Sequence, residues 1–198
     1  MKPTRFETAI ALIDKKNAED INTYYVCGMS YPKELLYSQR MTRTLLQFKP
    51  NASRAVQIAA RAQHICRWKI PRDEYPMDRV GYLKWRETLK KMHAEITSDI
   101  LKQVGYDAQY ITRVSHLINK KLIKKNEEAQ LLEDVICLVF LNYYFEEFAA
   151  KHEDEKVIDI LKKTWVKMSE EGHKAALELK LSENSLTLVK SAISEIKP

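Results

Sequence analysis

Apolar side chains recur every three or four residues along most of this chain, which places them on one side of an α-helix. In residues 4–19, for example, Phe6, Ile10 and Ile13 share such a face. The same pattern, with its caps and breaks, predicts further helices over residues 33–48, 52–67, 79–103, 107–120 and 127–150, one or two helices within 153–180, and a short last helix after residue 182. A turn-rich stretch around Cys27 and an ordered, proline-containing loop over 70–79 are expected between them.

Composition agrees with this pattern. The 198 residues include only 4 glycines and 6 prolines, too few for the turns of a many-stranded fold. A chain of this length suits one substantial core. We therefore predict an all-α fold, a single compact multi-helix domain over residues 1–198.

Cysteine usage, hydropathy and charge bear on the cellular compartment and on the kind of partner. Cys27, Cys66 and Cys137 are scattered and form no Cys-x-x-Cys pair, which suits a reducing compartment. The most apolar stretch, 135–141, is too short to cross a bilayer, so no membrane association is expected. A cytoplasmic location follows, with the nucleus as the alternative. The net charge of +6 fits either an anionic partner or a solvated basic surface.

Asp134 is the clearest ionisable residue on a predicted apolar face. On a helix it lies beside Leu131, Leu138 and Leu141. A buried carboxylate needs a strong partner, because its desolvation is costly. Two interpretations follow: a core aspartate that caps a neighbouring helix or pairs with an arginine, or a metal ligand.

Three histidines raise the same question. His93 shares a face with Leu89 and Ile96, His64 lies near the end of a predicted helix, and His116 fits either a buried or an exposed face. Each could be a hydrogen-bonded core histidine. Together with Asp134 they provide four candidate metal ligands on successive helices, and helical proteins hold metals with inward-pointing side chains from facing helices.

The order of these segments resembles the HD-domain phosphohydrolases. The resemblance covers a core of about residues 34–145, with the helices of 153–198 following it, and the similar segments are 59–65, 93–101, 111–118 and 131–138. It implies an HD-domain-like fold and a divalent metal ion (Mn, Fe, Ni, Zn or Mg) held by His64, His93 and Asp134, with His116 as a further candidate.

Two departures from that pattern weaken the implied site. Ile65 stands where the superfamily has an aspartate after histidine, and Ser38 or Gln39 stands where a first histidine is usual. The site would then hold one metal weakly, use Glu95 or Gln63 as a substitute, or hold no metal.

A second resemblance covers nearly the whole chain. The segments Gln63-His64-Ile65, Arg67-Trp68, Ile70-Pro71-Arg72, Tyr75-Pro76, Gly81-Tyr82 and Trp85-Arg86 form a block similar to an uncharacterised "domain of unknown function" family. It implies no activity.

Arginines and aromatic residues alternate in this block. Arginine suits phosphate and carboxylate ligands through its planar fork, and it stacks on aromatic rings. The candidate phosphate-binding residues are Arg67, Arg72, Arg79 and Arg86. The alternative is that these arginines pair with Asp73, Glu74, Asp78 and Glu87 while the aromatic rings fill the core.

Three functions are consistent with these patterns. The first is a divergent HD-type metal-dependent phosphohydrolase that acts on a phosphorylated small molecule or nucleotide. The second is a non-catalytic binding module on the same helical scaffold, favoured by the missing ligands. The third is an RNA-binding protein that uses the arginine and aromatic block, although the chain has no known RNA-binding signature.

Overall fold

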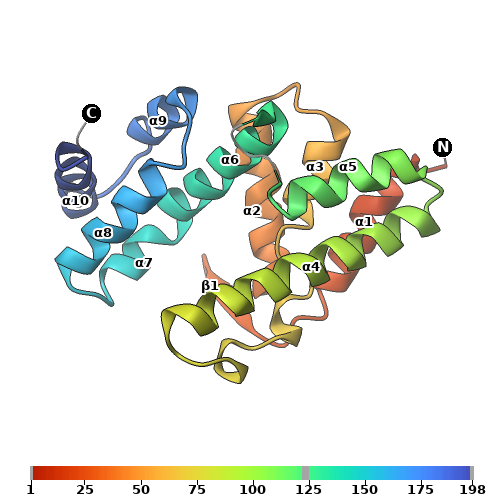
Figure 1. Ribbon diagram of the computed structural model, residues 1–198, viewed down its shortest axis with the longest axis horizontal. Helices are drawn as coiled ribbons and strands as arrows, with labels where there is room; N and C mark the ends of the chain where they lie inside the picture. The colour runs from red at the N-terminus through yellow and green to blue at the C-terminus, as the bar shows by residue number, and fades with distance from the viewer. Residues whose placement is uncertain (1, 122–124, 197–198) are drawn as a thin grey trace. The chain divides into compact units, whose positions relative to one another are not determined.

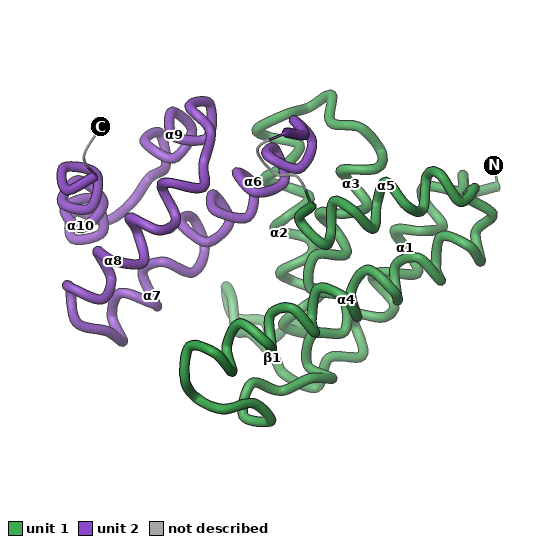
Figure 2. Tube along the Cα trace, viewed as in Figure 1, with its two compact units in different colours: residues 1–122 green, residues 123–198 purple. Residues whose placement is uncertain are grey.

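The computed structural model describes residues 2–121 and 125–196 and confirms the all-α class (Figure 1). The chain divides into two compact units, residues 1–122 and 123–198, coloured separately in Figure 2. The predicted core of residues 34–145 therefore includes parts of both units. Within the described residues, no helix is long and apolar enough to cross a membrane.

The described part of the first unit contains five α-helices. They are α1 (Arg5–Asn17), α2 (Lys33–Phe48), α3 (Arg54–Arg61), α4 (Arg79–Gln103) and α5 (Ala108–Ile118). Helix α5 packs against α3 and α4, and α1 contacts α2, α3 and α4. Ile13, Met41, Ile58 and Leu101 come from four of these helices and are fully buried in the shared core. The predicted apolar faces thus point inward.

Side-chain caps fix where several of these helices begin. Thr4 and Glu7 form a reciprocal capping box at α1, and the side chains of Ser53, Asp78 and Asp107 each accept a backbone N–H in the first turn of α3, α4 and α5. Such caps satisfy backbone donors that have no partner inside the helix. They explain why the predicted starts of these helices lie within a few residues of the observed ones.

A β-hairpin replaces the expected turn between the first two helices. Strands β1 (Thr23–Val26) and β2 (Met29–Pro32) pair antiparallel, with Tyr24 opposite Tyr31. The turn residues Cys27 and Gly28 both have positive φ, +49° and +80°. Two such residues suit the twist of a two-residue hairpin. Cys-Gly is a weaker hairpin signal than Asn-Gly or Asp-Gly, so the sequence indicated only a turn.

The chain leaves helical geometry earlier after α3 than predicted. The helix ends at Arg61. Turns with a hydrogen bond from the N–H of residue i+3 to the oxygen of residue i follow, and then two 3-10 helices, η1 (Arg67–Lys69) and η2 (Arg72–Glu74). Cys66 adopts the left-handed conformation at φ +56°, and its N–H donates to the buried side chain of Asn17 at 3.2 Å. His64 therefore lies in a turn rather than on a helix.

The second unit consists of α6 (Glu127–Tyr143), α7 (Phe145–Ala149), α8 (Asp154–Trp165), α9 (Glu170–Leu177) and α10 (Glu183–Ser194). Helix α6 is buried along most of its length, and α8 packs against α10. The predicted helix over 127–150 is divided at Tyr144, whose φ of −129° lies outside the helical region. The predicted segment 153–180 forms two helices, as the cap at Ser169 requires.

Candidate functional site

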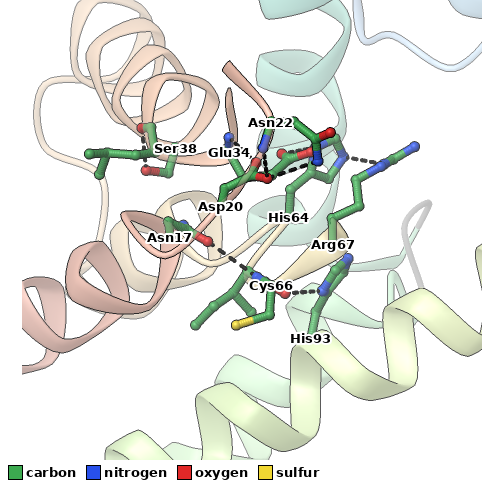
Figure 3. A network of polar contacts seen from close by, with 11 residues as sticks. Asn17, Asp20, Asn22, Glu34, Ser38, His64, Cys66, Arg67 and His93 are labelled. Atoms are coloured by element: carbon green, nitrogen blue, oxygen red, sulfur yellow. Dashed lines mark hydrogen bonds and ion pairs between the residues drawn. The ribbon is translucent and has the colours of Figure 1, made fainter. Parts of the chain in front are cut away.

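A cluster of ionisable side chains lies inside the first unit (Figure 3). Glu34 comes from the first turn of α2, His64 and Arg67 from the turns after α3, and His93 from the middle of α4. The structure thus brings together His64, Arg67 and His93 from the sequence prediction and adds Glu34. Because these groups share a partly buried space, the protonation state of each depends on its neighbours.

His64 connects the other members of the cluster. Its Nδ1 lies 3.1 Å from Oε2 of Glu34, and its Nε2 lies 2.9 Å from Nη1 of Arg67. A guanidinium group only donates, so Nε2 accepts and Nδ1 carries the proton that is donated to Glu34. The ring also stacks on Tyr37, with centroids 3.9 Å apart. Burial, followed by the charge of Arg67, lowers the pKa of His64 well below its ordinary value, so the ring is neutral.

His93 has an equally well-defined tautomer. Its Nδ1 lies 2.7 Å from the backbone oxygen of Ile65, which can only accept, so Nδ1 is protonated and Nε2 carries a lone pair. The side chain is buried, and its ring centroid lies 6.2 Å from that of His64. Burial and the neighbouring His64 lower the pKa of His93 to about 3. The imidazole is therefore neutral at physiological pH.

Glu34 is a buried carboxylate, 5% exposed, at the start of α2. Its own N–H donates to Oδ2 of Asp20 at 3.0 Å, which fixes this end of the helix. Burial raises the pKa of Glu34, while the positive charge of Arg67 acts in the opposite direction. Glu34 and Arg67 are thus the two charges of the cluster, with the neutral ring of His64 between them.

Arg67 has more donors than the chain uses. Its guanidinium group lies 4.7 Å from the ring centroid of Trp85, in a cation–π arrangement. Burial is the main cause that lowers its pKa, which nevertheless stays far above neutrality for a guanidinium group. Of its five N–H groups, one is hydrogen-bonded to His64 within the described part of the chain. The others are available to an anionic ligand.

Arg72 holds the loop beside the cluster in place. It donates to the backbone oxygens of Tyr75 at 2.9 Å and Pro76 at 2.8 Å, and it lies 5.8 Å from the ring centroid of Trp85. The indole N–H of Trp85 in turn donates to the oxygen of Ile70 at 2.9 Å. Arg72 therefore has a structural role in orienting Trp85, against which Arg67 packs.

The other two predicted arginines differ in position. Arg86 is half-buried, and its charge lowers the pKa of both His64 and Arg67, which places it near the cluster. Arg79 is exposed at the start of α4. Among the described residues, none of the four arginines forms an ion pair with Asp73, Glu74, Asp78 or Glu87, contrary to that alternative. Glu87 pairs with Lys90 instead.

Asp134 lies in the second unit and caps a neighbouring helix. Its Oδ1 accepts the N–H of Ser169 at 2.7 Å, and its Oδ2 accepts the hydroxyl of Ser169 at 2.6 Å, at the start of α9. Gln130 donates to Oδ1 at 3.1 Å. A Cβ at Gly172 would lie 2.7 Å from the same oxygen, so glycine allows this close approach. These contacts correspond to the capping interpretation of Asp134.

Three of the four candidate metal ligands, His64, His93 and His116, lie in the first unit, and Asp134 lies in the second. Both ring nitrogens of His64 and both oxygens of Asp134 are already hydrogen-bonded, and His116 is exposed on α5. In residues 2–121 and 125–196, no three His, Cys, Asp or Glu side chains are grouped so that they could hold a metal ion. Metal binding stays a prediction from the sequence, and His93, unlike His64, retains a ring nitrogen that could serve it.

Replacement of Asp134 with alanine should destabilise the second unit. It leaves the N–H and hydroxyl of Ser169 without their acceptor, and we expect a loss of about 2 kcal/mol in the free energy of unfolding. Urea denaturation of the full chain, with hydrogen exchange to localise the effect to α9, measures it. Glu170→Gln, an exposed residue on the same helix, is the control. An unchanged midpoint and unchanged exchange in α9 would contradict the capping role.

Sequence reasoning missed Glu34, although a signal was present. Glu34 lies at offsets of four, seven and eleven from Ser38, Met41 and Leu45, all of which are buried on the inner face of α2. This is the criterion that identified Asp134. Its position in the first turn of the helix, directly after Pro32, suggested an ordinary first-turn acid that favours the helix dipole.

The fold and this cluster define an all-α protein with a partly buried polar site in its first unit. A family model described as "Domain of unknown function (DUF4202)" matches residues 7–189, so the chain belongs to this family. Comparison with curated proteins gave no match, and neither did comparison with solved structures. The membership agrees with the resemblance of the arginine and aromatic block.

Proposed function

We propose that residues 1–122 bind an anionic small molecule, a phosphorylated metabolite or nucleotide, with Arg67 as the principal ligand-binding residue. The observation that carries this proposal is the largely unused guanidinium group of Arg67, held by His64 on one side and Trp85 on the other. A cation fixed in this way loses little conformational entropy when it binds a phosphate or carboxylate. Oxygen atoms of the ligand would accept hydrogen bonds from the remaining N–H groups of Arg67.

The charges around His64 favour an anion over a cation. Arg67, Arg86, Lys120 and Lys33 all lower the pKa of this ring, and Glu34 is the only carboxylate in contact with it among the described residues. The local balance is therefore positive. Partial burial strengthens the attraction, because charges interact more strongly where water is excluded. Phosphate fits this environment better than a carboxylate, since it carries more charge and presents more acceptor oxygens.

HD-type phosphohydrolysis is a second proposal. It is supported by the order of segments described above and by His93, whose Nδ1–H donates to a backbone oxygen as in many metal-bound histidines. Because the other candidate ligands do not fit, we derive no metal-dependent step. Release of phosphate from nucleotides on addition of manganese, abolished in His93→Gln, would support hydrolysis. No release with any divalent ion would favour the binding module.

RNA binding receives less support. Stacking on bases requires an accessible aromatic face, but Trp85 is 7% exposed and lies against Arg67 and Arg72. Tyr82 is more exposed, at 44%. Among the described aromatic residues of the block, Tyr82 alone is exposed, and one such ring beside a partly buried arginine suits a small ligand better than a polynucleotide chain.

The test of the anion site is a change at Arg67. Arg67→Gln keeps one donor for His64 but removes the charge, and we expect it to weaken binding of pyrophosphate or ATP about 10- to 100-fold. Isothermal titration calorimetry of the full chain measures this, with circular dichroism to verify folding. The matched control is Arg43→Gln, an exposed arginine on α2. Equal affinities for Arg67→Gln and the wild type, or no binding by the wild type, would contradict the proposal.

A further inference from the structure

The two histidines of the cluster present different groups to a ligand. The ring nitrogens of His64 are both used, by Glu34 and by Arg67. His93 uses Nδ1 as a donor to Ile65, which leaves Nε2 as an acceptor. In Figure 3 the ring of His93 lies near the backbone end of Arg67, while the guanidinium group of Arg67 extends to Nε2 of His64. The ring centroids of His64 and His93 are 6.2 Å apart. A ligand that extends from the guanidinium group past His64 would therefore meet a second group with the opposite hydrogen-bonding character.

The acceptor character of His93 does not change near neutral pH. Its tautomer is set by the 2.7 Å contact with a backbone oxygen, which is independent of pH. Its pKa is lowered to about 3, mainly by burial, so Nε2 stays unprotonated and does not donate. Within the described residues, no side chain or backbone N–H donates to Nε2. In a hydrogen bond, this nitrogen can thus pair only with a group that brings its own proton.

A neutral donor fits this position better than a cationic one. The positive charges of Arg67 and Arg86 act on His64, and His64 in turn lowers the pKa of His93. An ammonium group next to these arginines would be repelled, whereas a hydroxyl group carries no charge. A ligand hydroxyl would supply the donor that Nε2 of His93 does not find among the described residues.

We propose, on the basis of the anion site at Arg67, that the ligand carries a hydroxyl group near its phosphate and that Nε2 of His93 accepts a hydrogen bond from it. The ligand class is then a polyol or sugar phosphate, including the sugar phosphate part of a nucleotide. His93 selects for the hydroxyl and Arg67 binds the anion. Sites built to bind a hydroxyl reject analogues without it strongly, because their own polar group is then left unpaired.

The experiment compares two phosphate esters of similar size. Glycerol 3-phosphate has hydroxyl groups on its carbon chain, whereas n-propyl phosphate has none and therefore reports the anion site alone. Calorimetry of the full chain should show glycerol 3-phosphate binding at least about 10-fold more tightly than n-propyl phosphate. His93→Leu removes the acceptor, so the ratio should fall to about one while the affinity for n-propyl phosphate changes less than about 3-fold. His93→Gln restores an acceptor oxygen and should recover part of the ratio.

The outcomes separate this inference from the proposed function. Equal affinities of the wild type for the two esters would overturn the role of His93 and leave the anion site intact. A preference that persists in His93→Leu would also overturn it. No binding of any phosphate compound would overturn the anion site and this inference together. If His93→Leu does not fold, the wild-type ratio and His93→Gln decide the question.

Discussion

Lowering the pH from 7 to 5 should reduce the free energy of unfolding by about 2 kcal/mol through His93 alone. Its pKa is about 3 in the folded chain and about 6.5 when unfolded, so the unfolded state binds the proton first as the pH falls. The stabilising contribution is therefore complete above pH 6.5 and is lost as the pH falls from 6.5 toward 3. His64 acts in the same direction, since its pKa is also lowered.

Glu34 acts in the opposite direction. Its pKa is raised above 4.5 by burial, so its contribution to stability is present below pH 4.5 and is lost as the pH rises through the folded value. As the pH falls, protonation of Glu34 therefore restores part of the stability that is lost through His93 and His64. Urea denaturation at pH 7, 6 and 5 measures the net effect, and His93→Gln should show a smaller loss than the wild type. Identical losses in both proteins would contradict the buried neutral state of His93.

Replacement of Gly81 with alanine should lower the free energy of unfolding by about 3 kcal/mol. A Cβ at this position would lie 2.1 Å from the backbone oxygen of Pro76 and 2.8 Å from its carbonyl carbon. Both atoms belong to the backbone, so the loop must move as a whole. The same oxygen accepts a hydrogen bond from Arg72, so the movement would also disturb the support of Trp85 and Arg67.

Thermal unfolding and hydrogen exchange of residues 70–78 measure this effect, and Lys84→Ala on the exposed side of α4 is the control. We expect faster exchange in the loop and weaker binding of pyrophosphate in Gly81→Ala. Wild-type stability and exchange would show that the loop accommodates the methyl group, and the proposed support of Arg67 by this loop would then be wrong.

The sequence predicted the helices well because their signals are local. Apolar periodicity and the breaks that flank it located α2 and α4 at the observed bounds, Lys33–Phe48 and Arg79–Gln103. The turn at His64 and the hairpin were not predicted. The first depends on the contact between Asn17 and the backbone of Cys66, 49 residues apart. The second depends on positive φ at Cys27, which the residue type does not favour.

The sequence predicted only part of the candidate site, because its signals are local and the contacts of the site are not. Periodicity shows that His93 and Asp134 point inward, and both are buried. It does not show which partner each meets: the backbone oxygen of Ile65 for His93, and Ser169 for Asp134. Those partners depend on tertiary packing. Arg67 was included because arginines alternate with aromatic residues, and its contact with Trp85 is an example of that pairing.

The most direct test of the anion site is nuclear magnetic resonance of the side chains of Arg67 and His64. Titration of the labelled full chain with inorganic phosphate should shift the Nε–H signal of Arg67 and the Nδ1–H signal of His64 along one saturable curve. The signal of the exposed Arg43 should change little. Saturable shifts confined to the Arg67 cluster are the result that we predict. An Arg67 signal that does not move, or moves only in proportion to salt as Arg43 does, would contradict the central claim.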